Sequence, residues 1–540
     1  MLFRNLAQHG MLLASTLPLS KAMFRSPIKL DVELSARSES ATTENASKPA
    51  ATPKPYISPQ CAKACATLLS TFQSSQVDSV GVDAYQTDQA QYWSKFAEDV
   101  QPACFFHPYN KHEVAAAIKL ADQDNCRFVV VSGGHTPFKD GSTAEGGITI
   151  TFSNMKNVTV SDDRSLVSIE PGNRWYDVYK ALEPASMNVI GGRVAHVGTA
   201  GLLLGGGISY FSNRYGWAMD NIANYEVVLV SGEIIDVNNT TNPDLYWALR
   251  GGGGNFGIIT RFDLLAYEQQ PLFWSGDRVV DSTIYNNTIL DAVLDWATSG
   301  WVDNKSAIEI AFAYVQEYGL WIQESTLTHM DPQPNGSHPA AFDGWYKANV
   351  TLRDKEGNIP PTELTQDLES ANGKRQLVYT MTVEPDRQLA SDILEIWRQE
   401  VTPMVNFSDI LPALQFQPQT PNIFQAMRRN GGNCVGLQDR NSTLLILNWS
   451  IGWSDPADDA AVNAAYARVT QRVTELSQAR GLFHPFKYAN YAHPSQDPIA
   501  TYGEENKQRL LKISHKYDPT GVLQRNPGQF KLNGSPPQTG

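Results

Sequence analysis

One histidine follows a glycine turn that comes directly after a strongly apolar segment. The stretch reads Arg127-Phe-Val-Val-Val-Ser-Gly-Gly-His135. Its consecutive valines are β-branched and indicate a buried strand over Val129–Val131. Gly133 and Gly134 allow the backbone to turn with positive φ and to present amide N–H groups to an anion such as a pyrophosphate. An imidazole held there would be a general base, a metal ligand or a covalent attachment point, or a turn residue without a chemical role.

Two more glycine-rich stretches follow, over residues 191–207 and 251–257. Gly252, Gly254 and Gly257 match the pattern G-x-G-x-x-G. A helix is expected before them and a strand, Ile258–Leu264, after them, which reverses the order of a Rossmann site. No Gly-Lys-Ser/Thr ending marks a P-loop. Because runs of three and four glycines cost chain entropy, we interpret these stretches as backbone segments that hold a long, phosphate-bearing cofactor.

The composition is that of an acidic globular protein. The chain has 540 residues, a formal net charge of −13 and 42% hydrophobic residues. Its length predicts two domains or one large composite domain. The negative charge argues against nucleic acid as a partner, and no apolar run of roughly 18 residues predicts a membrane span. The expected partners are a small-molecule substrate and O₂.

Five cysteines bear on metal binding and on disulfides. Cys61 and Cys65 lack a second pair or histidines at zinc spacing, so no metal site is expected. A disulfide from Cys61 or Cys65 to Cys104 is predicted instead, leaving Cys126 and Cys434 apart. The odd count leaves at least one free thiol.

The elements positioning the glycine stretches predict an α+β protein. Helices are expected over Cys61–Phe72, Glu113–Asp124 and Trp175–Leu182, and a hairpin joins Tyr225–Val230 to Ile234–Val237. Asn242 is expected to cap a helix that starts at Pro243. Later, long helices (Asp281–Thr298, Arg387–Val401, Ala457–Ala479) alternate with aromatic strands (Ile308–Val315, Leu377–Val383, Leu444–Trp453). We predict a cofactor domain over 59–270, a substrate domain of sheet and covering helices over 271–482, and a segment over 483–540 that returns to the first domain.

The N-terminus predicts entry into the secretory pathway. Residues 1–22 read as a signal peptide, with Arg4 before a short apolar stretch, and 23–58 as a disordered spacer or pro-segment. Asn-x-Ser/Thr sequons support this reading because they carry glycans only in that pathway. They lie at Asn45, Asn157, Asn238, Asn239, Asn286, Asn304, Asn335, Asn349, Asn406, Asn441, Asn448 and Asn533.

Several of these motifs together resemble a known family. Val131-Ser-Gly-Gly-His135, Val197-Gly-Thr-Ala-Gly-Leu-Leu-Leu-Gly-Gly-Gly207, Asp220-Asn-Ile222 and Gly251–Thr260 are similar to the FAD domain of the vanillyl-alcohol-oxidase/p-cresol-methylhydroxylase superfamily. Tyr488-Ala-Asn-Tyr491, Lys516–Gly521 and Pro527–Phe530 resemble the C-terminal segment of its berberine-bridge-enzyme-like branch. The resemblance implies a two-subdomain FAD-binding domain of the p-cresol-methylhydroxylase (PCMH) type plus a substrate domain of antiparallel sheet covered by helices.

The resemblance also implies roles for individual residues. His135 would bond covalently to the 8α-methyl group of FAD, and Tyr488 would be the catalytic base or a donor that orients the substrate. The remaining cofactor contacts would be Ser132, Gly133, Gly134, Thr136, Gly198, Gly201, Gly205, Gly206, Gly207, Ser209, Asp220, Asn221, Ile222, Gly257, Ile258 and Asn490. Tyr488 would need a neighbouring donor or charge to act as a base at neutral pH, because tyrosine ordinarily titrates near ~10. Alternatively it only packs on the flavin.

Two positions depart from the family pattern. Many relatives attach the flavin a second time through a cysteine, where this chain has Val194, so attachment at His135 alone is expected. Some relatives have a tyrosine after the triple glycine, where this chain has Ile208, with Tyr210 two residues on. That difference disfavours a mechanism with a tyrosine pair.

The predicted function is an FAD-linked oxidase of an alcohol or amine carbon in a small organic metabolite, with O₂ reduced to H₂O₂, in secondary metabolism. The alternatives are an oligosaccharide oxidase and a non-redox flavoprotein that steers a cyclisation. His196 and His493 are expected to be polar wall residues and Asp497 a turn cap. Trp449 and Trp453 share a strand face and are expected in the core, with the substrate cavity as the alternative.

Overall fold

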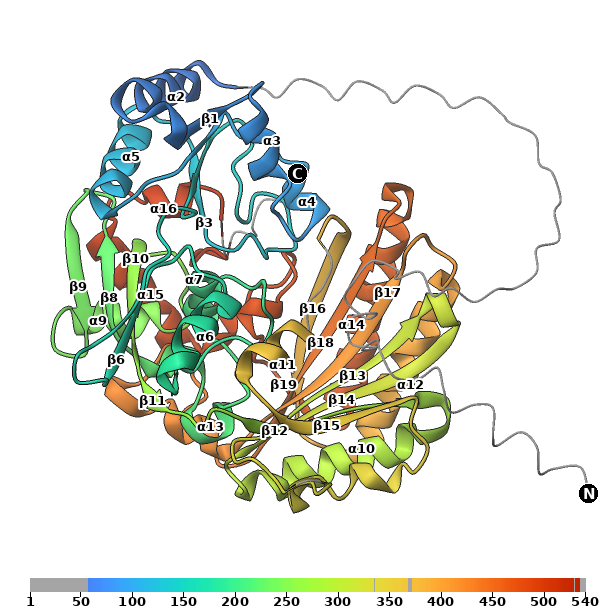
Figure 1. The fold of residues 1–540 in the computed structure, drawn as a ribbon. Coiled ribbons are helices and arrows are strands. Elements are labelled where there is room, and N and C mark those ends of the chain that lie inside the picture. Colours follow the sequence, from blue (N-terminus) through green and yellow to red (C-terminus); the bar gives the residue numbers. More distant parts are fainter. Residues whose placement is uncertain (1–56, 335, 368–371, 529, 535–540) are drawn as a thin grey trace, which may run out of the picture.

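The computed structural model describes residues 57–534 except 335, 368–371 and 529. Within this range three larger sheets, each with helices, form the molecule. The first two, built from the part of the chain before residue 270, lie together on one side, and the third lies on the other (Figure 1). The predicted α+β class is confirmed. The signal peptide and nearly all of the spacer fall outside the described residues. No helix in the described part is long and apolar enough to cross a bilayer.

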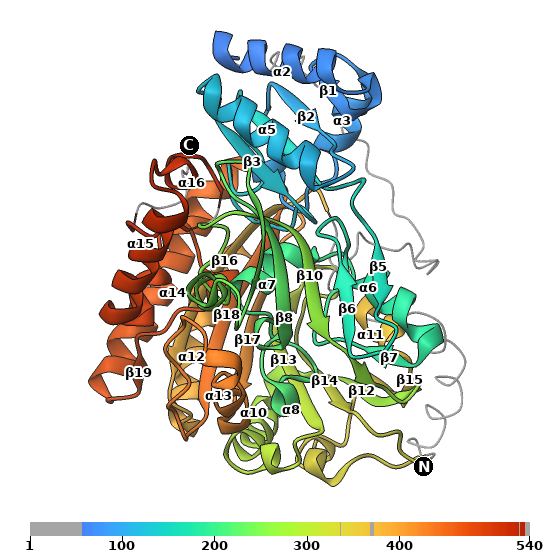
Figure 2. The same cartoon turned by 90° about the vertical axis from the view of Figure 1, so that its left-hand side faces the viewer.

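The first sheet positions the histidine turn. Its strand order is β1 (Val77–Ser79), β2 (Cys104–Phe106), β4 (Ile148–Thr151) and β3 (Phe128–Val131). β3 and β2 run parallel to β4, so the carboxyl end of β3, and with it Ser132–His135, emerges at one edge of the sheet. Helices α2 (Pro59–Thr71) and α5 (Lys111–Gln123) bury their apolar faces against it. Figure 2 shows this layer above the rest of the molecule.

The second sheet is antiparallel, and the other two glycine stretches lie in the segments that connect its strands. Its order is β5 (Val158–Val160), β6 (Leu166–Ile169), β10 (Ile258–Leu265), β8 (Ile222–Val228) and β9 (Ile234–Asn238). Helices α6 (Trp175–Leu182), α7 (Thr199–Gly205) and α9 (Pro243–Leu249) pack on its core. The predicted hairpin is confirmed as β8 and β9.

Helix α9 begins where predicted, but its capping differs from the prediction. Asn242 has φ +54° and makes no side-chain capping bond. Its Nδ2 instead donates to the Asp236 carbonyl at 3.0 Å. The helix start is therefore set by Pro243 and by the left-handed residue before it.

The third sheet is antiparallel, in the order β15 (Arg353–Ile359), β12 (Phe273–Asp281), β14 (Leu320–His329), β13 (Ser306–Val315), β17 (Leu411–Gln419), β18 (Leu444–Trp453), β16 (Arg375–Val383) and β19 (Phe483–His484). One face packs its apolar side chains against α10 (Ser282–Thr298), α12 (Arg387–Val401) and α14 (Asp459–Ala479). Trp449 and Trp453 belong to this core, as expected. Because side chains alternate along a strand, the intervening residues form a second face. That face carries polar residues, among them Glu309, Gln415 and Asn448.

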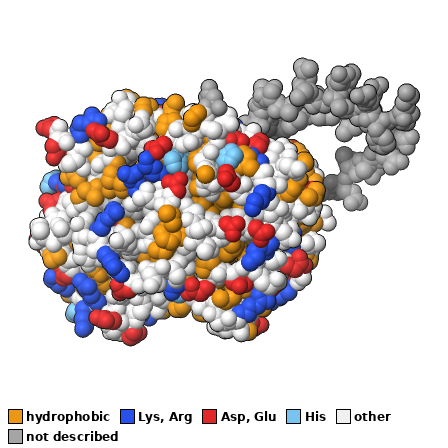
Figure 3. Space-filling model, turned by 90° about the horizontal axis from the view of Figure 1, so that it is seen from below, with side chains coloured by type: hydrophobic (Ala, Val, Ile, Leu, Met, Phe, Trp, Pro, Cys, Tyr) orange, Lys and Arg blue, Asp and Glu red, His pale blue; other side chains and the backbone are white. Residues whose placement is uncertain are grey.

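The end of the chain packs against the glycine-rich part of the first half. Tyr502 Oη donates to the Gly251 carbonyl at 3.0 Å, and Phe128 N donates to Asn526 Oδ1 at 2.7 Å. Helix α15 (Glu504–Tyr517) lies beside α9. On the face seen from below, acidic and basic side chains are interspersed across the coloured surface (Figure 3).

Two disulfides tie α2 to the first sheet. Cys65 bonds to Cys104, one of the two pairings predicted. Cys61 bonds to Cys126, a pairing that the sequence did not predict. Residues four apart lie on one face of a helix, so Cys61 and Cys65 of α2 point the same way, and Cys61 meets Cys126 just after the end of α5. Cys434 is free and buried.

This pairing predicts the labelling pattern of the protein. Denatured without reductant, the chain should take up one iodoacetamide group, on the Cys434 peptide, and five after reduction. Peptide mass spectrometry measures both. Replacing Cys65 with serine should lower the free energy of unfolding by about 2–5 kcal/mol, since the disulfide closes a loop of 39 residues. Uptake of three groups before reduction would contradict the pairing.

Candidate active site

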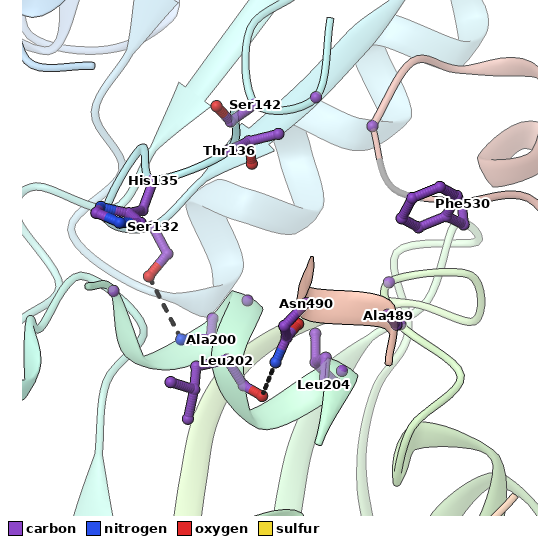
Figure 4. Close-up of a pocket in the computed structure, with 18 of the residues that line it drawn as sticks. Ser132, His135, Thr136, Ser142, Ala200, Leu202, Leu204, Ala489, Asn490 and Phe530 are labelled. Atoms are coloured by element: carbon purple, nitrogen blue, oxygen red, sulfur yellow. Dashed lines mark hydrogen bonds between the residues drawn. The ribbon is translucent and has the colours of Figure 1, made fainter. Parts of the chain in front are cut away.

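One cavity of about 410 Å³ joins the three sheets. The turn after β3 forms one wall, α7 and the loop before it form a second, and the polar face of the third sheet forms another. Figure 4 shows part of this wall, with His135 and Ser132 on one side, Phe530 on the other, and Asn490 beside Leu202 of α7 below. The loop 251–257 and residues 526–528, 530 and 531 complete it.

The turn after β3 is anchored at Ser132. Its Oγ donates to the Pro171 carbonyl at 2.6 Å and accepts from the amide of Ala200 at 3.4 Å (Figure 4). Gly134 has φ +67°, as a turn that exposes successive amides requires. Among the hydrogen bonds of the described residues, none uses the amides of Gly133–Thr136 as donors. A row of available N–H groups in a cavity wall is the donor set that a pyrophosphate needs.

The turn crosses the start of α7 at backbone contact distance. A Cβ atom on Gly133 would lie 2.4 Å from the amide nitrogen of Gly198, and one on Gly198 would lie 2.3 Å from that of Gly133. Gly205 is approached equally closely, since a Cβ there would lie 2.0 Å from Asn490 Oδ1. These glycines therefore let separate segments close around the cavity. The cradle and its amides fit a dinucleotide cofactor.

His135 lies in the cavity wall beneath an aromatic ring. The indole of Trp93 stacks on its imidazole, with ring centroids 4.1 Å apart and an interplanar angle of 13°. Burial, together with smaller contributions from the charges of Arg174 and His196, lowers the pKa of His135 to about 3. The imidazole is therefore neutral at physiological pH, which is the form that can act as a nucleophile.

The lowered pKa predicts the pH dependence of any bond formed by His135. An ordinary imidazole, with a pKa near 6.5, would lose about tenfold in its neutral fraction at about pH 5.5. Since His135 becomes protonated only near pH 3, the rate of the flavin attachment that the family resemblance implies should stay flat from about pH 5.5 to about pH 8. Protein made under riboflavin depletion, mixed with FAD and followed by mass spectrometry, measures this rate. A tenfold fall at about pH 5.5 would show that the imidazole titrates normally.

Tyr488 is buried, and its hydroxyl oxygen lies in a pocket of donors. It accepts from the amides of Gly207 at 2.8 Å and Ile208 at 3.1 Å, and from Asn490 Nδ2 at 3.2 Å. Burial raises the pKa of Tyr488, the nearby Tyr491 raises it further, and the three donors only partly offset this. At neutral pH the residue keeps its proton, which favours an orienting donor over a base.

Lys531, which the sequence analysis did not predict as a site residue, lies in the cavity wall. Lys531 donates to the Leu523 carbonyl at 2.8 Å, and burial lowers its pKa to about 8. Beside it, Asn255 Nδ2 donates to the carbonyls of Gly252 and Phe530. A cation beside glycine-rich backbone suits an anionic ligand. No local pattern announces it, because the tail reaches the wall through long-range packing.

The cavity brings together most of the residues predicted to hold a cofactor. Its wall includes Ser132, Gly133, Gly134, His135, Thr136, Gly198, Gly201, Gly205, Gly257, Ile258, Tyr488 and Asn490. Val194 also lines it, whereas Cys434, the free cysteine of the described residues, does not. Gly206, Gly207, Ser209, Asp220, Asn221 and Ile222 do not line it either.

These six residues lie behind the wall and support it. A Cβ on Gly206 would lie 2.7 Å from the Tyr488 ring, so this glycine makes room for the tyrosine. Asp220 is buried, accepts from Asn433 Nδ2 at 2.7 Å, and has its pKa raised to about 6 by that burial. Asn221 Nδ2 donates to the Tyr215 and Trp217 carbonyls.

The polar residues of the third sheet that line the cavity were also not predicted from the sequence. Glu309, Gln415, Asn448 and Ser450 line the cavity there, and Arg193 reaches it from the loop before α7. The signal available in the sequence was alternation, since Gln415, Gln417 and Gln419 share one face of β17. Asn448 is only 5% exposed, so the sequon at this position is buried in the folded protein.

The remaining sequence predictions concern side chains outside the wall. His493 stacks on Tyr379 with centroids 4.0 Å apart, and burial lowers its pKa to about 4. Neither His493 nor His196 is among the side chains that line the cavity. Asp497 Oδ1 accepts from the amide of Ala500 at 3.0 Å, which confirms the turn cap.

Comparison with known proteins agrees with this geometry. A family model described as an FAD binding domain matches residues 102–238. A FAD-dependent monooxygenase of Cochliobolus heterostrophus is 34% identical over 453 residues, covering 82% of this chain and 87% of that protein. One of Fusarium proliferatum is 32% identical over 473 residues, covering 86% and 90%. The solved structure of a Physcomitrella patens BBE-like protein superposes with a TM-score of 0.70 at 17% identity, covering 88% of this chain and 99% of that one.

Proposed function

Because the chain belongs to the FAD-dependent oxidoreductases of the PCMH-type, berberine-bridge-enzyme-like family, we propose that it oxidises an alcohol or amine carbon of a small organic metabolite. The observation that carries the proposal is the single cavity that joins the His135 turn to the polar face of the third sheet. A flavin held at the turn and a substrate held at the sheet would share this space. We place the reaction in secondary metabolism.

The chain's own residues would bind FAD in three ways. The amides of Gly133–Thr136 and the ammonium group of Lys531 suit the pyrophosphate. The glycines of α7 and of loop 251–257 admit the cofactor close to the backbone. The neutral imidazole of His135 is available for one covalent bond, and Val194 offers none. Bound FAD supplies a hydride acceptor that returns its electrons to O₂, giving H₂O₂.

Tyr488 would orient the substrate rather than remove its proton. Its raised pKa keeps the hydroxyl protonated, and the donors at its oxygen fix the ring in place. Glu309 provides a carboxylate in the same cavity, held at 3.1 Å by Arg193. The cavity thus offers a proton donor from the tail and an acceptor from the third sheet.

Anaerobic mixing with a panel of primary alcohols, amines and reducing oligosaccharides tests the proposal. Loss of the yellow absorbance with an alcohol or amine, and recovery with one H₂O₂ per turnover on admitting air, is the expected result. Bleaching only by oligosaccharides would support a sugar oxidase, and persistent colour with every compound a non-redox flavoprotein. Since relatives carry the name monooxygenase, the reaction should also be run in ¹⁸O₂. Incorporation of ¹⁸O into the organic product would contradict the oxidase proposal and indicate a monooxygenase.

We also propose that the protein is exported through the secretory pathway, which the two disulfides support. The sequon residues Asn157, Asn304 and Asn349 are exposed and offer glycan acceptors. Enzymatic deglycosylation of protein from a eukaryotic host should lower its mass and convert occupied asparagines to aspartate, with Asn448 unchanged. A protein of unmodified mass would contradict export.

A further inference from the structure

A continuous polar network crosses the sheet wall of the cavity. Arg193, itself buried, lies at its head. Its Nη1 is 3.1 Å from Glu309 Oε2, and its Nη2 donates to Gln417 Oε1 at 2.8 Å and to Tyr491 Oη at 3.0 Å. Gln417 Nε2 donates to Gln415 Oε1 at 3.2 Å, and Asn448 Nδ2 donates to the same oxygen at 2.9 Å. The network thus joins the loop before α7 to strands β13, β17 and β18.

Arg193 fixes the direction in which every amide of this network points. A side-chain amide can usually exchange its oxygen and nitrogen by flipping, but a guanidinium has donors only. Gln417 must therefore turn its oxygen toward Arg193 and its nitrogen toward Gln415. The oxygen of Gln415 then faces both neighbours, so Asn448 must offer its nitrogen to it. The oxygen of Asn448 is left pointing away from the network.

That oxygen has no hydrogen-bond partner among the described residues. Asn448 lines the cavity, its side chain is more than nine-tenths buried, and its Oδ1 is buried and unpaired. A buried acceptor without a donor is costly, and such groups in a cavity wall are normally satisfied by a ligand or an ordered water. Ser450, two residues along β18 on the same face, lines the cavity too, but its hydroxyl rotates to donate or accept. Of these two β18 residues, only Asn448 imposes a direction.

We propose that Asn448 Oδ1 accepts a hydrogen bond from an O–H or N–H group of the substrate. Arg193, through Gln417 and Gln415, is the positioning residue that keeps this oxygen, rather than the amide nitrogen, unpaired at the cavity wall. The inference rests on the proposed function and narrows it. The site selects molecules that present a donor at this wall over molecules of similar shape that lack one, because an unmatched buried polar group is penalised more than a missing apolar contact.

Binding of alcohols and their methyl ethers to the FAD-loaded, dithionite-reduced protein tests the proposal without turnover. The probes are benzyl alcohol with benzyl methyl ether and cyclohexanol with cyclohexyl methyl ether, titrated by calorimetry. At least one alcohol should bind about tenfold more tightly than its ether. Asn448→Leu, close in size, should remove the preference, whereas Ser450→Ala should keep it. If every alcohol bound no better than its ether, or Asn448→Leu kept the preference, the proposal would be overturned.

A second variant tests the positioning role of the network. In Gln417→Glu the carboxylate still accepts from Arg193 but cannot donate to Gln415, so the amides of Gln415 and Asn448 should both flip. Asn448 Nδ2 would then face the cavity, and the preference should fall at least tenfold or reverse toward the ether. An unchanged preference in this variant would refute the role of Arg193. These outcomes are separable from failure of the proposed function. If a substrate bleaches the flavin but the alcohols bind no better than their ethers, only this inference is contradicted.

Discussion

Replacing His135 with alanine is expected to release the flavin from the chain. In the unmodified protein about one flavin per chain should remain with the precipitate after acid treatment, on the peptide that contains His135. In the variant the flavin should appear in the supernatant. The reason is that the cavity wall offers one neutral imidazole at the turn, held under Trp93 with its pKa lowered by burial. Mass analysis of the peptides, before and after substitution, measures the change.

A matched histidine serves as the control for this variant. His493 also has a pKa lowered by burial and is stacked on an aromatic ring, but it does not line the cavity. His493→Ala should therefore keep the adduct. A flavin adduct on any other peptide, or an adduct that survives in His135→Ala, would contradict single attachment at this turn.

Features that depend on local sequence were predicted well. Helix α6 spans Trp175–Leu182, as its apolar periodicity predicts, and the hairpin of β8 and β9 follows its turn signal. The strand before Ser132 and the turn after it were readable because β-branching and glycine act on the backbone directly. The predicted cofactor residues nearest these signals do line the cavity.

Features that depend on distant contacts were not readable. The Arg193 network joins residues separated by more than a hundred positions. The register of β13, β17 and β18 aligns the strand residues, and packing of the loop before α7 on the third sheet adds Arg193. The same register buries Asn448, whose sequon looks like a surface site in the sequence. Lys531 reaches the wall because the tail folds back on the first sheet.

Glycine itself was the ambiguous signal. A glycine that admits a cofactor and a glycine that admits another part of the chain look alike in a sequence. At Gly207 a Cβ would meet Ala218 and Leu202, so the missing side chain serves packing inside the protein. The close approach at Gly133 and Gly198 is also between two chain segments, but it forms the edge of the cavity. A change at this contact between Gly133 and Gly198 should therefore affect both the stability of the protein and the shape of the cavity.

Gly198→Ala is expected both to lower the free energy of unfolding and to lower the flavin content per chain. The residue has φ −70° and ψ 149°, values that alanine adopts freely, so the penalty is one of space alone. The added Cβ would lie 2.3 Å from the amide nitrogen and 2.6 Å from the Cα of Gly133. Backbone atoms cannot rotate away as a side chain does, so either α7 or the turn that carries His135 must shift. Overpacking of this kind costs about 1–3 kcal/mol.

The control for this variant is Gly357→Ala on edge strand β15. A Cβ there would meet nothing within 4 Å, and its φ is not in the left-handed region. Its free energy of unfolding should change by no more than about 0.5 kcal/mol. Denaturant unfolding and the flavin content per chain measure both variants. If Gly198→Ala unfolded at the same denaturant concentration as Gly357→Ala and kept a full covalent flavin, the two backbone segments would not meet as described, and the cradle they form would have to be placed elsewhere in the cavity.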